Sequence, residues 1–250
     1  MTWERVGTGE DPFGLPRDIA ARLKDCVQSE DAPQDLAIEF LWVYISEDGV
    51  GEGASRSDGR RPLVLDEWLA VIDEAAALGA TTIIMSLGCR LSERPEVPAM
   101  MEWAQSTHGM SVGLHVYNQP MSQDEIRPLL GLDQALTCLF ASRDILDDMR
   151  FAERMGIRLC EAECQEKPVV SPTCTFPEVM PCVGAYGGMY TCGLVLGDET
   201  YRLGNVFDRK LASIMADEKL PHIVPEGVPK LKRTCNGCPP LMARRLKGLR

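Results

Sequence analysis

Four cysteines in the last third of the chain have the type and spacing of metal ligands. Cys235 and Cys238 form a CxxC pair in TCNGC, and nine residues separate Cys182 from Cys192 in CVGAYGGMYTC. Two cysteines separated by two residues can turn both thiolates toward one metal, and the intervening Asn-Gly suits the tight turn required. The glycines between Cys182 and Cys192 allow both ends of that connection to reach the same site. We therefore predict that these four thiolates hold one metal centre.

The predicted metal is a single 4Fe-4S cluster, with zinc as the alternative. Both accept four thiolates in a tetrahedral array, so spacing alone does not exclude zinc. A lone CxxC would equally fit buried small side chains or a redox pair. Two cysteine pairs in one short segment with few aliphatic residues favour a metal, because small domains commonly need a bound metal to be stable.

The other six cysteines have weaker patterns. Cys160, Cys164 and Cys174 form C-x3-C-x9-C, but thiols at a C-x3-C spacing on an extended strand lie about 13 Å apart. Cys164 and Cys174 are stand-in ligands if one of the four is not a ligand. The isolated residues are expected to pack in the core: Cys26, Cys89 and Cys138.

Composition and charge exclude several classes of protein. The N-terminal sequence MTWERVGTGEDPFGLPRDIA is unlike a signal peptide, and no apolar run approaches the ~18 residues that span a bilayer. We expect a cytoplasmic protein without a membrane segment, whose ten cysteines stay reduced. The net charge is −11, although residues 201–250 hold 11 Lys and Arg against 4 Asp and Glu. An acidic body with a basic end argues against nucleic-acid binding.

The basic tail LMARRLKGLR has two interpretations. It is either a docking segment, for a partner or for the acidic body of the chain itself, or a solvated helix end.

Strands and helices alternate through the first two thirds of the chain. Buried strand patterns occupy 37–46, 81–88, 110–118, 135–142 and 157–164, and helical patterns occupy 65–80, 97–109, 122–132 and 144–156. This order predicts an α/β fold with a partial (β/α) barrel-like parallel sheet. Five strands are too few for a complete eight-stranded barrel.

A change of character near residue 166 predicts two domains, 1–165 and 166–250. Four prolines follow this point in QEKPVVSPTCTFPEVMPC. Residues 189–207 then alternate like an antiparallel hairpin with Gly197-Asp198 near its turn, and residues 208–220 have a helical pattern. The second domain is predicted to hold the metal.

The run from Cys182 to Cys238 resembles the SPASM or twitch auxiliary-cluster domain of radical SAM enzymes. The resemblance is carried by C-x9-C with Gly187 placed as G-x4-C, by RLGNV at 202–206 followed by a helix, and by the late CxxC. It implies that Cys182, Cys192, Cys235 and Cys238 ligate an auxiliary 4Fe-4S cluster. Downstream cysteines for a conventional second cluster are missing.

The upstream half resembles the radical SAM domain with one departure. The family's C-x3-C-x2-C loop after the first strand is replaced by a segment without cysteine, and its Gly-Gly-Glu motif by Leu87, Gly88, Cys89 and Arg90. The resemblance therefore implies a truncated, degenerate domain without S-adenosylmethionine cleavage of its own. We expect an accessory protein that transfers electrons or presents a substrate or partner. The alternatives are an enzyme subunit completed by a partner chain and a structural zinc protein.

The partner expected for such an accessory protein is a redox enzyme or a peptide or protein substrate. The histidines form no catalytic arrangement and are expected at the surface or as satisfied core residues: His108, His115 and His222. Asp73 and Glu74 are expected on a solvated helix face. Any ligand of the parallel sheet is expected at the carboxyl ends of its strands, near Ser46, Ser86, Asn118 and Ser142.

Overall fold

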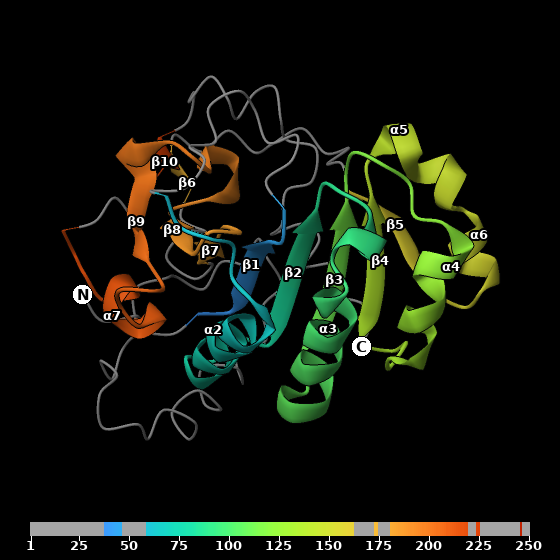
Figure 1. The fold of residues 1–250 in the computed structure, drawn as a ribbon, viewed down its shortest axis with the longest axis horizontal. Helices are drawn as coiled ribbons and strands as arrows, with labels where there is room; N and C mark the ends of the chain where they lie inside the picture. The colour runs from blue at the N-terminus through green and yellow to red at the C-terminus, as the bar shows by residue number, and fades with distance from the viewer. Residues whose placement is uncertain are drawn as a thin grey trace, which may run out of the picture.

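An eight-stranded mixed sheet organises the molecule. The structure is a computed structural model that describes residues 38–46, 59–162, 173–174, 181–219, 224–225 and 246. The strand order is β5-β4-β3-β2-β1-β7-β8-β9, and β10 and β6 form a separate pair (Figure 1). The strands are β1 (Phe40–Tyr44), β2 (Thr82–Leu87), β3 (Ser111–Val116), β4 (Thr137–Ala141), β5 (Leu159–Glu161), β6 (Thr173–Cys174), β7 (Cys182–Val183), β8 (Gly188–Tyr190), β9 (Arg202–Asn205) and β10 (Val224–Pro225).

Strands β1 to β5 are parallel and follow one another across the sheet, as the alternating pattern predicts. The helices between them are α2 (Leu65–Ala77), α3 (Glu96–His108), α4 (Gln123–Ile126), α5 (Arg143–Leu146) and α6 (Phe151–Arg154). The α/β class and the parallel sheet are therefore confirmed. The complete sheet is mixed, because β8 and β9 are antiparallel to their neighbours.

Two predicted helices are broken into shorter pieces. The segment 122–132 forms α4 and then a 3-10 helix, η3 (Arg127–Gly131), with Pro128 near its start. Proline lacks the N–H that an α-helix interior needs, so the α-helix does not continue. The segment 144–156 forms α5, the 3-10 helix η4 (Asp147–Met149) and α6, and then ends at Gly156 with φ +96°.

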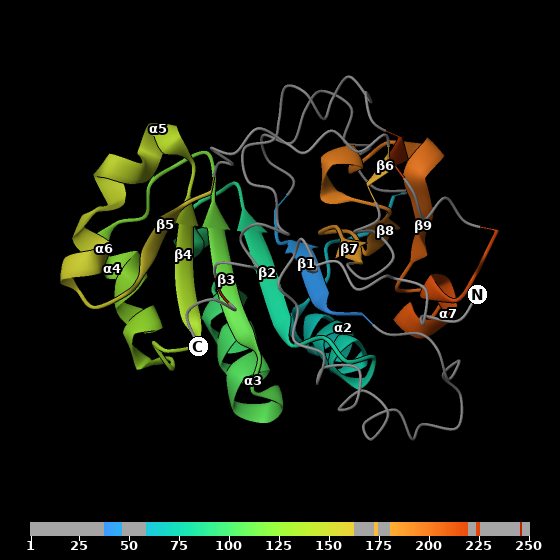
Figure 2. The same cartoon turned by 180° about the vertical axis from the view of Figure 1, so that it is seen from behind.

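Each face of the sheet has its own core. Side chains alternate between the faces along a strand, so Leu41, Val43 and Ile83 point to the outer face. There they pack against α2 and α3, which lie on the same side of the sheet (Figures 1 and 2). The inner face carries an aromatic-rich cluster that includes Phe40, Trp42, Tyr44, Ile84, Cys138, Phe140, Cys182 and Tyr190.

Strands β7 to β9 extend the sheet beyond β1. β7 lies parallel to β1, with Trp42 opposite Cys182, and β8 and β9 continue in antiparallel register. The predicted hairpin is confirmed, since β8 pairs with β9 and Gly197 between them has φ +81°. The predicted helix 208–220 is shorter, α7 (Leu211–Met215), and its first N–H is accepted by Glu74 Oε2 of α2 at 2.6 Å.

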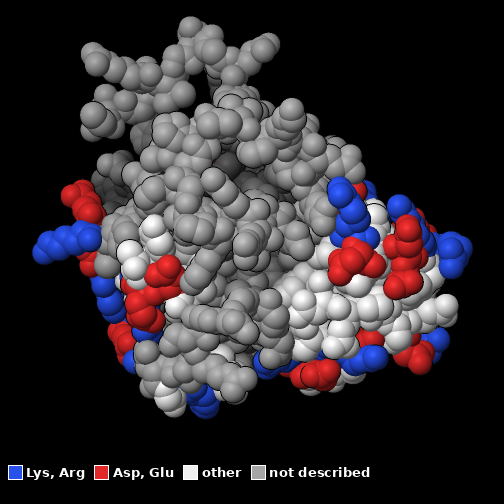
Figure 3. Space-filling view, turned by 90° about the horizontal axis from the view of Figure 1, so that it is seen from above, with Lys and Arg blue, Asp and Glu red and all other residues white. Residues whose placement is uncertain are grey.

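The 3-10 helices η2 (Leu91–Glu93), η6 (Gly193–Val195) and η7 (Glu199–Tyr201) complete the described elements. Within the described ranges, no helix is long and apolar enough to cross a membrane. Acidic and basic side chains of the described residues lie beside one another at the end of the molecule seen in Figure 3, rather than in separate patches.

Candidate functional site

Two of the four predicted metal ligands lie next to the sheet. Cys182 begins β7 and is fully buried, whereas Cys192 follows β8 and is half-buried. Cys235 and Cys238 lie outside the described residues. The structure thus places one predicted pair and leaves the other pair a prediction.

Cys182 and Cys192 belong to the same inner-face cluster. Cys182 is the register partner of Tyr190 across β7 and β8, and Cys192 is two residues beyond Tyr190. The backbone of Cys192 is still extended, with φ −155° and ψ 148°. Cys182 belongs to the inner-face cluster, and Cys192, which lies beyond the last residue of β8, packs against the same cluster. The nine-residue connection brings both thiols to one region.

The surroundings of this pair are apolar and aromatic. Trp42 lies opposite Cys182 in β1, and Leu196 belongs to the same cluster. Gly193 packs directly on Trp42 and Tyr44, since a Cβ at that position would lie 2.5 Å from the Trp42 ring and 2.6 Å from the Tyr44 ring. The residue after Cys192 is thereby held against β1.

This donor set fits a soft metal centre. Thiolates suit zinc and iron-sulfur clusters, and carboxylate or carbonyl oxygens suit magnesium and calcium. The described residues contain no group of three or more His, Cys, Asp and Glu side chains placed to hold a metal ion. The other two ligands of a four-thiolate centre would have to lie outside the described residues, where the predicted ligands Cys235 and Cys238 are.

A buried hydrogen-bond chain crosses the inner face beside this pair. Trp42 Nε1 donates to Ser86 Oγ at 2.9 Å, and Ser86 Oγ lies 3.2 Å from His115 Nδ1. Burial lowers the pKa of His115 from 6.5 to about 4, so its imidazole is neutral at pH 7. His115 is a core residue, but only one of its two ring nitrogens has a partner among the described residues.

The carboxyl ends of β1 to β3 are tied together by polar contacts. Ser46 Oγ accepts from the Gly88 N–H at 2.9 Å, and its carbonyl accepts from the Tyr117 hydroxyl at 3.2 Å. Asn118 Nδ2 donates to the Gly88 carbonyl at 3.1 Å. Gly88 stands where the resemblance would place the family's Gly-Gly-Glu motif, and its backbone N–H and carbonyl are both hydrogen-bonded within the chain.

The remaining cysteines largely follow expectation. Cys89 and Cys138 are buried, as predicted for core packing. Cys160 lies half-buried against the inner-face cluster, and Cys174 is placed by its backbone pairing with Val224. Cys26 and Cys164 lie outside the described residues.

Asp73 and His108 connect two outer helices. Asp73 Oδ1 accepts from Trp103 Nε1 and lies 2.7 Å from His108 Nε2. Asp73 is half exposed, as expected, but it also joins α2 to α3. Glu74, which lies on α2 like Asp73, caps α7, because its carboxylate accepts from the Leu211 N–H. His222 lies outside the described residues.

No protein-family model matches the sequence, and no curated protein matches it. Solved structures do match the fold. Streptococcus suis SuiB bound to S-adenosylmethionine aligns with a TM-score of 0.50 at 12% identity, over 74% of this chain and 67% of that chain. BtrN in an open conformation aligns with a TM-score of 0.50 at 9% identity, over 74% of this chain and 83% of that chain. Both are radical SAM-family proteins. At these identities the likeness concerns the fold, and this chain has a radical SAM-like fold.

Proposed function

We propose that this chain is an iron-sulfur accessory protein whose Cys182, Cys192, Cys235 and Cys238 hold one 4Fe-4S cluster. The observation that supports the proposal is that Cys182 and Cys192 pack in the same apolar inner-face cluster. Residues 166–250 form the cluster-binding unit in this proposal, although their strands β7 to β9 continue the sheet of the first part.

Four thiolates fill the coordination positions of such a cluster. A closed site suits electron transfer or structure rather than Lewis-acid chemistry. We propose that the protein works in the cytoplasm, where it passes electrons to a redox enzyme or presents a peptide or protein substrate. In this proposal the chain does not cleave S-adenosylmethionine by itself, because its sequence lacks the cysteine loop and the Gly-Gly-Glu motif of the family.

Metal analysis tests the cluster. Anaerobically purified protein should contain about four irons and four sulfides per chain and show a broad visible absorption that bleaches with dithionite. Cys182→Ser and Cys238→Ser should each lower the iron content. Cys89→Ser is the matched control, because Cys89 is buried in a different core cluster from Cys182 and Cys192. About one zinc per chain without colour would favour the structural zinc alternative and contradict the redox proposal.

The enzyme alternative has one supporting observation, the fold shared with SuiB, which was solved with S-adenosylmethionine bound. In that alternative a partner chain supplies the missing motifs. The reconstituted protein, incubated with S-adenosylmethionine and dithionite, should form no 5′-deoxyadenosine if the accessory proposal holds. Deoxyadenosine formation by the isolated chain would contradict it.

A further inference from the structure

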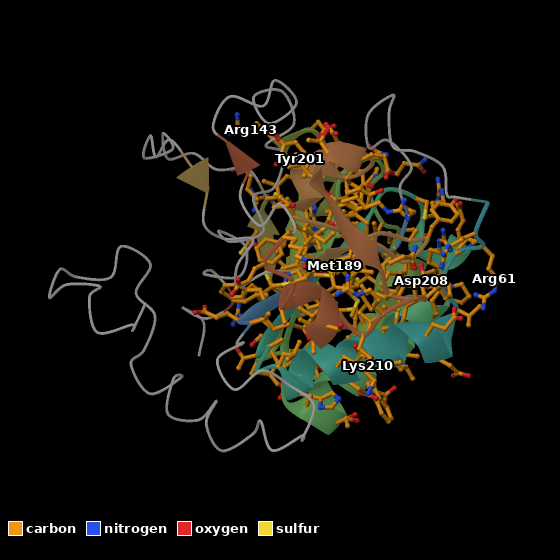
Figure 4. The ribbon with its side chains drawn as sticks, turned by 90° about the vertical axis from the view of Figure 1, so that its left-hand side faces the viewer. Arg61, Arg143, Met189, Tyr201, Asp208 and Lys210 are labelled. Atoms are coloured by element: carbon orange, nitrogen blue, oxygen red, sulfur yellow. The ribbon has the colours of Figure 1, made fainter. Side chains whose placement is uncertain are left out.

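A groove runs between helix α2 and the turn that follows strand β9. Its volume is about 110 Å³, which holds one side chain, whereas pockets for drug-sized ligands have about 300 Å³ or more. Figure 4 shows Arg61, Asp208 and Lys210 along α2 on this side of the molecule. Apolar residues and two carboxylates, but no Lys or Arg, form its described lining. They include Leu63, Val71, Val206 and Phe207, with Glu67 and Glu74.

Contacts within the chain hold both walls of the groove. Glu67, Val71 and Glu74 stand four and seven residues apart on α2, so they share one face of the helix. On the other wall, the Phe207 N–H donates to Asn205 Oδ1 at 2.9 Å, and Asn205 is itself buried. These contacts pre-organise the groove, which lowers the cost of binding.

The two carboxylates differ in what they can still accept. Arg61 donates to both oxygens of Glu67, at 2.7 and 2.8 Å, so the charge of Glu67 is already paired. Glu74 Oε2 accepts from the uncharged N–H of Leu211 at 2.6 Å. Among the described residues Glu74 makes no ion pair, not even with Lys210, which precedes Leu211. Its second oxygen, Oε1, is therefore an acceptor that suits a cation.

Exposed apolar side chains lie beside the groove. Phe207 lines it and is 36% exposed, and Val64, which follows the lining residue Leu63, is 51% exposed. Exposed apolar side chains around a recess are typical of a surface that contacts another protein. A partner chain can cover these side chains while one of its own side chains enters the groove.

We propose that this groove receives a lysine side chain of a peptide or protein partner. The aliphatic part of the lysine packs on Val71 and Val206, and its ammonium group binds the Glu74 carboxylate. A purely apolar side chain would cover this carboxylate without pairing its charge, which is unfavourable. Arginine binds a carboxylate best through both oxygens, and one oxygen of Glu74 is already used, so the single ammonium of lysine fits better.

The groove and the proposed metal ligands lie on opposite faces of the sheet. Val71 of α2 belongs to the outer cluster, whereas Cys182 belongs to the inner-face cluster and Cys192 packs against it. Lysine binding therefore does not rest on the metal centre, and the two proposals can fail separately. Leu246, the described residue of the basic tail, also packs on the inner face, and the rest of that tail lies outside the described residues. The proposed occupant is accordingly a partner.

Methyl NMR of the full-length protein with labelled leucine and valine tests the binding. The probe is N-acetyl-lysine amide, and its match is N-acetyl-norleucine amide, which has the same aliphatic stem without the ammonium. Ligands of this size bind with a Kd on the order of 1 mM. The lysine amide should shift the methyl signals of Val71 and Val206 but not those of Leu130, which does not line the groove. The norleucine amide should bind about threefold more weakly or worse, because it lacks the charge.

Two matched variants test the role of Glu74. Glu74→Gln should weaken the binding of the lysine amide about threefold or more and leave the norleucine amide unchanged. The amide oxygen of the variant can still accept from the Leu211 N–H, so the cap of α7 is kept. Asp66→Asn is the control, because Asp66 is an exposed residue of α2 that does not line the groove. It should leave binding unchanged, which excludes a general attraction of cations to a chain with a net charge of −11.

Several outcomes would overturn the proposal. These are equal affinity for the two amides, an equal loss in Glu74→Gln and Asp66→Asn, and no methyl shift with about 10 mM lysine amide. Ala70→Phe is a further variant that leaves the α7 cap untouched. Ala70 is exposed and lines the groove, so the larger ring should fill it and abolish lysine binding. Full lysine binding in folded Ala70→Phe would show that the groove is not the site.

Discussion

His115 shows how one buried side chain can set a pH dependence. Its pKa is lowered from 6.5 to about 4 by burial, while the unfolded chain keeps the ordinary value. Between these values the unfolded state binds more protons, so stability falls as the pH falls. The contribution is fully present above pH 6.5 and is lost toward pH 4, by about 3 kcal/mol in total.

We predict that His115→Phe flattens this dependence. Urea unfolding at several pH values between 7 and 4 should show a smaller loss of unfolding free energy in the variant than in the wild type. Only the slopes are compared, so a constant offset from the lost Ser86 contact does not matter. Equal slopes in both proteins would contradict the assignment to His115.

Gly193 provides a second test at a single residue. A Cβ there would meet the rings of Trp42 and Tyr44 at 2.5 and 2.6 Å. Gly193→Ala must displace aromatic core side chains, and we expect it to lower the free energy of unfolding by about 1 to 3 kcal/mol. Gly131→Ala is the control, since nothing lies within 4 Å of its Cβ position. Urea denaturation measures both, and similar effects of the two substitutions would contradict the close packing.

At the scale of elements, Glu125 joins the loop after β2 to helix α4. Its carboxylate accepts from the N–H and hydroxyl of Ser122 at 2.8 and 2.9 Å, and from those of Ser92 at 3.2 and 3.1 Å. Burial raises the pKa of Glu125, but these hydrogen bonds lower it more, so the net shift is downward. The carboxylate therefore holds η2 and α4 in place in its charged form.

We predict that Glu125→Ala lowers the unfolding free energy by about 1 to 3 kcal/mol at pH 7, because buried donors lose their acceptor. Asp124→Ala is the matched control. Asp124 precedes Glu125 in α4 and its side chain is 87% exposed, so this substitution should change the free energy of unfolding little. Since the folded-state pKa of Glu125 is lowered, its stabilisation is present above the unfolded pKa and is lost on acidification. A cost for Glu125→Ala that does not shrink at low pH would contradict this role.

At the scale of the whole molecule, one core runs across both predicted domains. Val183, Met189 and Leu203 of β7 to β9 belong to the same outer cluster as β1 to β4, and Figure 4 shows Met189 inside the molecule. The Leu63 N–H donates to the Ala185 carbonyl at 2.9 Å, and Arg60 Nη2 donates to both carboxylate oxygens of Asp208. Figure 4 shows Asp208 and the neighbouring Arg61 near α2.

We predict that Met189→Ala shifts a single cooperative unfolding transition. Its fully buried side chain should cost about 2 to 5 kcal/mol, and tryptophan fluorescence and far-UV circular dichroism should still change together. Leu130→Ala serves as the exposed control. Two separate transitions, with only the first shifted, would show that β7 to β9 unfold independently.

The sequence by itself determined the order and type of the main elements. Local periodicity and turn residues are set by neighbours along the chain, so β1 to β5, α2 and α3 could be predicted to within a few residues. Pro128 is the local signal for the shorter helix α4, and Gly156 marks the end of α6. The thiol spacing of the predicted metal centre is likewise a local property, and the metal centre stays a prediction. The expected radical SAM-like fold agrees with the structural neighbours.

Only the tertiary structure decided which of these elements meet. The pairing of β7 with β1, which puts Cys182 beside Trp42, joins segments far apart in sequence. Trp42 and Ser86 are 44 residues apart, and Ser86 and His115 are 29 apart, so no local pattern marks their contact. Leu246 lies close to Gly113, which is likewise far away in sequence. These contacts are stabilised by the burial of apolar surface between distant strands. That free energy is gained only after the strands have come together.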